Sequence, residues 1–144
     1  MKVGFFSVKP YDIDQFDRIN QTFGLQIEYF DYRLCMQTVR LAYGFEVICA
    51  FVNDSLSEEV LIELSENGTK VIAMRCAGFN NVDLEVAKKL NLRVVNVPSY
   101  SPESVAEHTV ALMLTLNRKI HKAYQRTRDA NFSLTGLVGF NMQN

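Results

Sequence analysis

The stretch FEVICAFV, at residues 45–52, decides the fold of this 144-residue chain. An apolar run of this length is typical of a strand in a parallel sheet, because helices cover both faces of such a strand. Strand-like and helix-like segments alternate along the sequence on both sides of the run. That alternation indicates a parallel sheet whose strands are joined by helical crossovers.

The spacing of apolar residues places the other elements. It predicts strands over 2–8, 25–31, 71–74 and 92–97, and helices over 12–23, 37–43, 55–67 and 82–90. We therefore predict an α/β fold over residues 1–100: a flavodoxin-like, doubly wound, parallel five-stranded sheet with helices on both faces. Ligands of such sheets bind at the carboxyl ends of the strands, so a site is expected in the loops that follow them.

Residues 101–144 differ from this pattern. Neither Gly nor a further Pro interrupts the sequence between Pro102 and Gly136, which predicts a single helix over 102–129. Such a helix would be ~42 Å long at ~1.5 Å per residue. Its first half, 105–116, is apolar on nearly every side, which is typical of a helix buried between two bodies. Its second half, 117–128, is basic.

Composition excludes several classes of function. Lys plus Arg is 15 and Asp plus Glu is 16, so nothing in the net charge favours nucleic acid or an anionic membrane as a partner. The three cysteines form no CxxC pair, which argues against a zinc site or a disulfide framework and favours a reducing compartment. The apolar run at the N-terminus is too short for a signal peptide, so we expect none, and no stretch approaches the ~18 apolar residues that a membrane span needs. We expect a cytoplasmic protein with no metal site.

The loop after the fourth predicted strand reads RCAGFNNVD, at residues 75–83. Gly78 permits close approach of a ligand to the backbone. The amides of Ala77 and Gly78, just ahead of a predicted helix, could hold a carboxylate, and Arg75 adds a positive charge. A tight strand-to-helix turn capped by Asn81 or Asp83 explains the same residues without a ligand.

The loop after the fifth strand reads VPSYSP, at residues 97–102. Tyr100 lies between two prolines, so a stiff segment holds it at the edge of the sheet where ligands bind. It could line a pocket, or it could be a surface aromatic residue on a turn.

Three stretches of the sequence carry a resemblance: RCAGFNNVD at 75–83, VPSYSPESVAEH at 97–108, and LNRKIHKAYQRTRDANFSL at 116–134. In this order and at this spacing they resemble the NAD-dependent D-2-hydroxyacid dehydrogenase family, and within it the fermentative D-lactate dehydrogenases of bacteria. FVND at 51–54 and the order of elements match as well. The resemblance covers essentially all 144 residues.

The resemblance implies roles for individual residues. It implies that the amides of Ala77 and Gly78 bind the substrate carboxylate and that Tyr100 lines the substrate pocket. The segment 104–108 would lie near the nicotinamide, which makes Val105 the candidate contact to the cofactor. The long helix would cross between domains and contribute to a homodimer interface, and residues 101–144 as a whole, helix and linker, would lead to an NAD-binding Rossmann domain.

The family's pyrophosphate-binding GxGxxG motif is absent from these residues, because none of the seven glycines is spaced to form it. The resemblance also implies that the catalytic arginine, carboxylate and acid–base histidine lie further along, and neither His108 nor His121 replaces that histidine. We expect the intact enzyme to reduce pyruvate to D-lactate with NADH. The 144 residues would supply substrate-binding residues, no catalytic residue and no tight site for NAD.

A different class of protein has the same predicted topology: a stand-alone regulatory or binding module, such as a response-regulator receiver. Asp54 follows the third strand, where a receiver has its phospho-accepting aspartate. A receiver also needs acidic residues after the first strand and a lysine after the fifth. The sequence has SVK at 7–9 and PS at 98–99 instead, and no phosphate-binding loop for a flavin.

Overall fold

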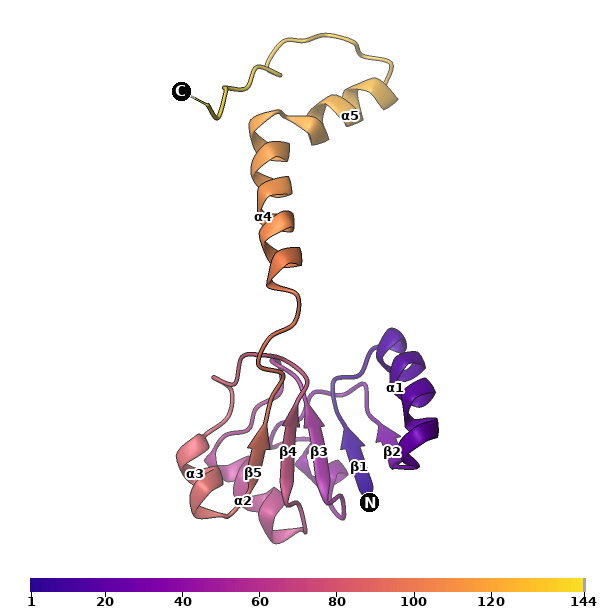
Figure 1. Cartoon of the computed structure of the whole chain (residues 1–144), viewed down its shortest axis with the longest axis vertical. Helices are drawn as coiled ribbons and strands as arrows, with labels where there is room; N and C mark the ends of the chain where they lie inside the picture. The colour runs from indigo at the N-terminus through magenta and orange to yellow at the C-terminus, as the bar shows by residue number, and fades with distance from the viewer. Residues whose placement is uncertain (144) are drawn as a thin grey trace. The chain divides into compact units, whose positions relative to one another are not determined.

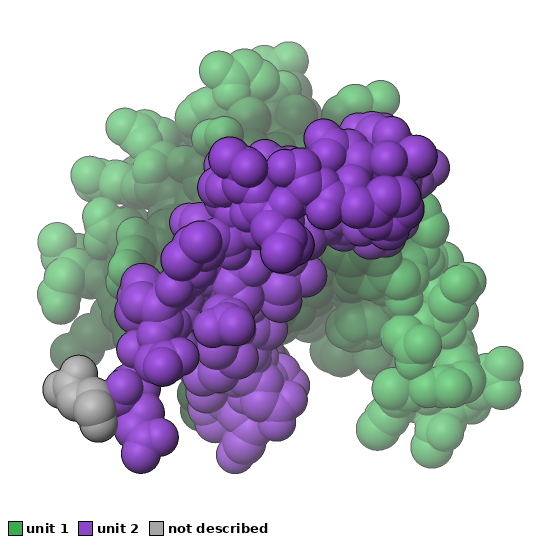
Figure 2. All heavy atoms as spheres, turned by 90° about the horizontal axis from the view of Figure 1, so that it is seen from above, with its two compact units in different colours: residues 1–98 green, residues 99–144 purple. Residues whose placement is uncertain are grey.

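A five-stranded parallel sheet forms the centre of the first of two units, Met1–Pro98. The structure, a computed structural model, describes residues 1–143, and Figure 2 colours the two units separately. The strands are β1 (Lys2–Phe5), β2 (Gln26–Tyr29), β3 (Val47–Ala50), β4 (Val71–Met74) and β5 (Arg93–Val95). They lie in the order β2-β1-β3-β4-β5, and every neighbouring pair is parallel. This is the flavodoxin-like order, so the predicted fold class is confirmed.

Helices cover both faces of the sheet (Figure 1). The helix α1 (Pro10–Phe23) covers one face, and α2 (Glu58–Glu66), α3 (Leu84–Lys89) and the 3-10 helix η1 (Val39–Ala42) cover the other. The strand β3 explains the apolar run of residues 45–52, because its alternate residues enter different cores. Ile48 packs with α2 and α3, whereas Cys49 packs on the α1 side.

Residues 99–143 contain two helices, so the single helix predicted for residues 102–129 is wrong. The helix α4 is Pro102–Asn117 and the helix α5 is Ile120–Arg128. Lys119, between them, has a left-handed backbone with φ of 56°, which no α-helix of L-residues continues through. The sequence carries no break signal here, since Lys119 is neither glycine nor proline.

The tail after α5 folds back onto the end of α4 within the second unit. The Asn117 side chain donates from Nδ2 to the Phe140 carbonyl oxygen and accepts from the Phe140 amide, both at 2.9 Å. Gly139 passes so close to α4 that a Cβ there would lie 2.5 Å from the Asn117 carbonyl oxygen. Arg126 donates to two further tail carbonyls, so side chains of both helices fix the tail.

Within the described residues, none of the helices combines the length and the apolar character that crossing a bilayer requires.

Candidate functional site

The loop that follows β4 is held in place through its carbonyl groups. Val97 donates its amide to the Cys76 carbonyl oxygen (3.2 Å), and the Asn96 side chain donates to that of Ala77 (2.8 Å). The Gly78 carbonyl accepts from the Cys76 thiol (3.2 Å). Across residues 1–143, by contrast, no acceptor is found for the amides of Ala77 and Gly78. Two neighbouring free amides are the donors that an anion-binding nest requires.

The fold itself does not require glycine at position 78. Its φ lies outside the left-handed region, and a Cβ built there would meet no atom within 4 Å. A side chain at this position would therefore project into open space. Close approach of a ligand to the backbone stays the predicted reason for a glycine here.

The start of α3 takes no part in this nest, contrary to the expectation from the sequence. The helix begins at Leu84 rather than at residue 82, so several residues separate it from Gly78. Its first turn is already capped, because the Asp83 carboxylate accepts from the Val86 amide at 3.0 Å. An anion at Ala77 and Gly78 would thus be bound by the amides of the loop and not by the start of α3.

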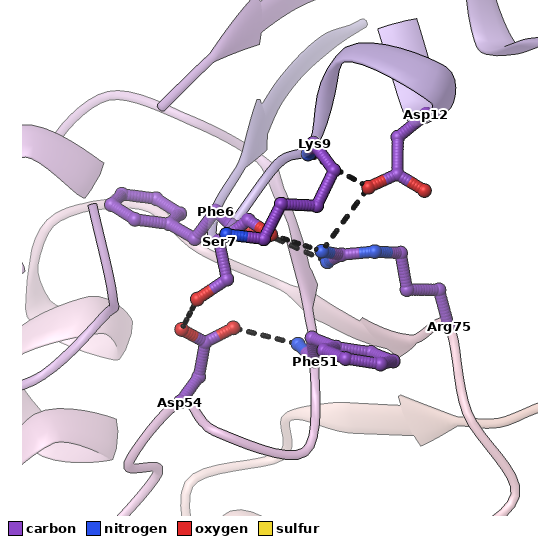
Figure 3. A network of polar contacts seen from close by, with 7 residues as sticks. All are labelled: Phe6, Ser7, Lys9, Asp12, Phe51, Asp54 and Arg75. Atoms are coloured by element: carbon purple, nitrogen blue, oxygen red, sulfur yellow. Dashed lines mark hydrogen bonds and ion pairs between the residues drawn. The ribbon is translucent and has the colours of Figure 1, made fainter. Parts of the chain in front are cut away.

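Arg75 points away from the loop that it begins (Figure 3). Its guanidinium donates to the carbonyl oxygens of Phe6 (2.9 Å) and Ser7 (2.6 Å), just beyond β1. It also lies 3.7 Å from an Asp12 carboxylate oxygen, in the first turn of α1. The sequence predicts that Arg75 adds a positive charge beside the carboxylate-binding amides. In the structure, its side chain is bonded to Phe6, Ser7 and Asp12 instead.

Asp54 joins the loops that follow β1, β2 and β3, and Figure 3 shows its contacts with Ser7 and Phe51. Its side chain is buried, with 2% of the residue exposed. The carboxylate accepts from the Ser7 hydroxyl (2.6 Å), the Leu34 amide (2.8 Å) and the Phe51 amide (2.6 Å). A receiver's phospho-accepting aspartate has to be accessible, so this engagement argues against the stand-alone receiver.

A cavity of about 350 Å³ lies at the same carboxyl edge of the sheet. Residues from the loops after β1, β2, β3 and β4 and from the first turn of α1 line it: Ser7, Lys9, Tyr11, Asp12, Asp31, Arg33, Phe51, Asn53 and Arg75. Its position is where β1 and β3 neighbour each other and the direction of winding changes, the usual ligand-binding place of this fold. The predicted nest residues Ala77 and Gly78 do not line this cavity.

Tyr100 and Val105 belong to the second unit, which is described by itself. Tyr100 precedes α4 and is 62% exposed, and Val105 lies in the first turn of α4 and is 61% exposed. Their predicted roles therefore stay predictions. Of the predicted site residues, Ala77 and Gly78 share the loop with the free amides, and the side chain of Arg75 points away from it.

Burial keeps two thiols near the site neutral. Burial raises the pKa of Cys49 to about 11, although the nearby Arg75 charge opposes the rise. Burial also raises the pKa of Cys76, which suits its thiol for donating to the Gly78 carbonyl. Residues 1–143 contain no cluster of His, Cys, Asp or Glu side chains that could hold a metal ion.

Sequence reasoning missed the residues that hold the loop. Asn96 ties down the Ala77 carbonyl, and Asn81 donates to the Phe51 and Asp54 carbonyls at 3.0 and 2.9 Å. The sequence predicts Asn81 or Asp83 as the helix cap, and Asp83 provides it. An asparagine directly after a strand is the one local signal for such a role, because its amide bonds readily to nearby backbone.

The sequence matches, over residues 3–136, the family described as D-isomer specific 2-hydroxyacid dehydrogenase, catalytic domain. It is 56% identical over 142 residues to the D-lactate dehydrogenase of Escherichia coli, covering 99% of this chain and 43% of that protein. The chain thus spans less than half the length of this curated relative, and it corresponds to the N-terminal portion.

Solved structures agree with this match. The apo-structure of D-lactate dehydrogenase from Escherichia coli superposes with a TM-score of 0.89 at 56% identity, over 99% of this chain and 45% of that one. The structure of D-lactate dehydrogenase from Aquifex aeolicus, complexed with NAD and lactic acid, superposes with a TM-score of 0.79 at 31% identity. That match covers 96% of this chain and 41% of the other. The chain therefore belongs to the D-isomer specific 2-hydroxyacid dehydrogenase family.

Proposed function

We propose that these 144 residues supply the carboxylate-binding half of the substrate site of an NAD-dependent D-lactate dehydrogenase. The observation that carries the proposal is the loop of residues 76–78, whose carbonyls are bonded while the amides of Ala77 and Gly78 have no partner within residues 1–143. Two such amides fit the carboxylate of pyruvate or D-lactate. The similarity to D-lactate dehydrogenases supports this choice of substrate.

The reaction needs groups that these residues do not include. NADH, when bound to the intact enzyme, supplies the hydride for the substrate carbonyl carbon. The residues of this chain do not fit a tight NAD site, because no GxGxxG loop is present to cradle the pyrophosphate. We propose that the chain alone neither binds NAD tightly nor turns over substrate, and that it binds and orients the carboxylate for a partner domain.

We propose roles for two residues of the second unit in the intact enzyme. Tyr100 would line the substrate pocket and Val105 would lie near the nicotinamide, in keeping with the resemblance to the family. The NAD and lactic acid in the Aquifex aeolicus relative support a site that holds both molecules together. We also propose a cytoplasmic location, which the three free cysteines favour.

We propose that α4 contributes to a homodimer interface in the intact enzyme. Its apolar side chains are exposed within the second unit: Val105, Val110, Leu112, Met113, Leu114 and Leu116. An apolar surface of this kind usually meets another protein surface.

A hybrid protein tests the proposal. This chain replaces the matching 43% of the Escherichia coli D-lactate dehydrogenase, and the remaining residues of that enzyme are kept. We expect the hybrid to oxidise NADH with pyruvate at a kcat/KM within about 10-fold of the parent, a barrier difference of roughly 1.4 kcal/mol. The product is expected to be D-lactate.

The isolated 144-residue chain, purified in the same way, is the control for contaminating host enzyme. A hybrid that folds with the parent's Tm and binds NADH, yet leaves pyruvate unreduced, would contradict the proposed function.

A further inference from the structure

The contacts of Arg75 assign it a role that differs from substrate binding. Arg75 directly follows β4, and its amide donates to the Ala50 carbonyl oxygen at 3.0 Å, which extends the pairing of β4 with β3 by one residue. Its side chain then crosses β3 to the end of β1, where it reaches the Phe6 and Ser7 carbonyls. One residue thus connects the nest loop to the loop that precedes α1.

Aromatic rings contact the guanidinium of Arg75, in addition to the carbonyl oxygens that accept from its N–H groups. It lies 4.5 Å from the centre of the Phe5 ring and 4.6 Å from that of Phe51, within the range of cation–π contact. The side chain is 11% exposed, and the Asp12 carboxylate balances its charge at 3.7 Å. A substrate carboxylate would have to displace these partners, so direct contact with Arg75 is disfavoured.

Arginine suits this position better than lysine. Its planar guanidinium donates to two carbonyls in a fixed plane while its two flat faces stack on aromatic rings, whereas a lysine ammonium is a compact point charge without that plane. One of the two carbonyls belongs to Ser7, whose backbone is left-handed with φ of 54°. A non-glycine residue in that conformation persists only where its surroundings hold it.

We propose that Arg75 is a positioning residue for carboxylate binding, which it supports by fixing the loop of Ala77 and Gly78 against β1 without touching the substrate. The inference rests on the proposed function of those two amides. Because only Cys76 separates Arg75 from Ala77, loss of the contacts of the Arg75 side chain lets the start of the loop shift. The amides then no longer converge on one carboxylate, although neither of them is changed.

The test uses the hybrid enzyme with Arg75→Lys, Asp12→Asn and, as a matched control, Arg18→Lys on the exposed surface of α1. Arg75→Lys keeps the positive charge and removes the planar guanidinium. We expect it to raise KM for pyruvate about 10-fold with kcat within about 2-fold, because carboxylate binding stabilises ground and transition states alike. Arg18→Lys should leave both constants unchanged.

Asp12→Asn distinguishes two possible roles of Arg75, because the change in KM for pyruvate has the opposite sign in each. In one role Arg75 positions the loop, and in the other it binds the carboxylate directly. The amide still accepts from the Lys9 backbone, as the carboxylate does at 2.9 Å, but the partner charge of Arg75 is lost. If Arg75 acts through the loop, the weaker contacts of its side chain raise KM, by about 3-fold. If Arg75 binds the carboxylate directly, its released charge lowers KM.

A lower KM for Asp12→Asn overturns the inference, and so does an unchanged KM for Arg75→Lys. Should Arg75→Lys fail to fold, the sign of the Asp12→Asn effect still decides. An unmutated hybrid that is inactive contradicts the proposed function instead, so the two failures are distinguishable.

Discussion

At the scale of single residues, Gly78 separates the requirements of the fold from those of the ligand. Its φ and the open space around it allow a side chain, so Gly78→Ala should leave the Tm of the hybrid unchanged. The added methyl group would lie where a carboxylate approaches the two amides. We expect KM for pyruvate to rise by about 10-fold or more, and Gly78→Val to have a larger effect.

Steady-state kinetics with pyruvate measures KM, and thermal unfolding of the same samples measures Tm. Wild-type kinetics in both Gly78 variants would place the carboxylate elsewhere.

The three cysteines should differ in reactivity, in a manner that depends on pH. A hydrogen bond with the Thr38 side chain lowers the pKa of Cys35, which is partly exposed, whereas burial raises the pKa of Cys49 and Cys76. A lowered pKa gives more thiolate at any pH below it, so iodoacetamide should modify Cys35 first at pH 7–8, where the buried thiols remain neutral.

Mass spectrometry of the native chain at a series of pH values identifies the modified thiol. Earlier labelling of Cys49 or Cys76 would show that the carboxyl edge of the sheet opens more readily than the structure implies. In the variant Cys35→Ser, the early modification by iodoacetamide should be absent.

At the scale of elements, the outcome of sequence reasoning depended on whether the deciding contacts were local. Strand-sized apolar runs and helical spacing predicted the parallel sheet, because burial on one or both faces leaves a period in the sequence. The break at Lys119 leaves no such mark, and two helices replaced the predicted one. The loop sequence around Gly78 indicated a nest, but the partners of Arg75 are 68 and 69 residues away and leave no local signal.

The contact between the tail and α4 yields a prediction at this scale. Gly139→Ala would place a methyl group 2.5 Å from the Asn117 carbonyl oxygen, so the tail must move away from α4. The hydrogen bond from the Phe140 amide to Asn117 is then lost. Since such a bond is worth about 1 kcal/mol, hydrogen exchange of the Phe140 amide should accelerate about 5-fold.

NMR-detected hydrogen exchange of the isolated chain measures this rate. Asn117→Ala removes the same bond from the other side and should give the same acceleration. Unchanged exchange at Phe140 in both variants would contradict the described fold of the tail.

At the scale of the whole molecule, exposed apolar side chains on α4 predict association of the isolated chain. Leu112 and Leu116 are at least half exposed, and burying them in a second surface is worth roughly 25 cal/mol per Å² before the costs of association. We expect light scattering at micromolar concentration to report dimers or larger species. Leu112→Glu combined with Leu116→Glu should shift the chain toward the monomer.

A monomeric wild-type chain, with the same stability as the double variant, would contradict a role for α4 in association. Lys122→Glu on α5 is a control that changes charge without changing the apolar surface.

Amide chemical shifts of Ala77 and Gly78 test the central claim most directly. The hybrid is labelled with ¹⁵N-alanine and ¹⁵N-glycine, saturated with NADH and titrated with oxamate, which carries the carboxylate of pyruvate but is not reduced. We predict that the Ala77 and Gly78 amide protons shift downfield more than those of any other alanine or glycine of this chain. Their shifts should saturate at the oxamate concentration that inhibits turnover. Inhibition by oxamate that leaves both amides unshifted would contradict the account.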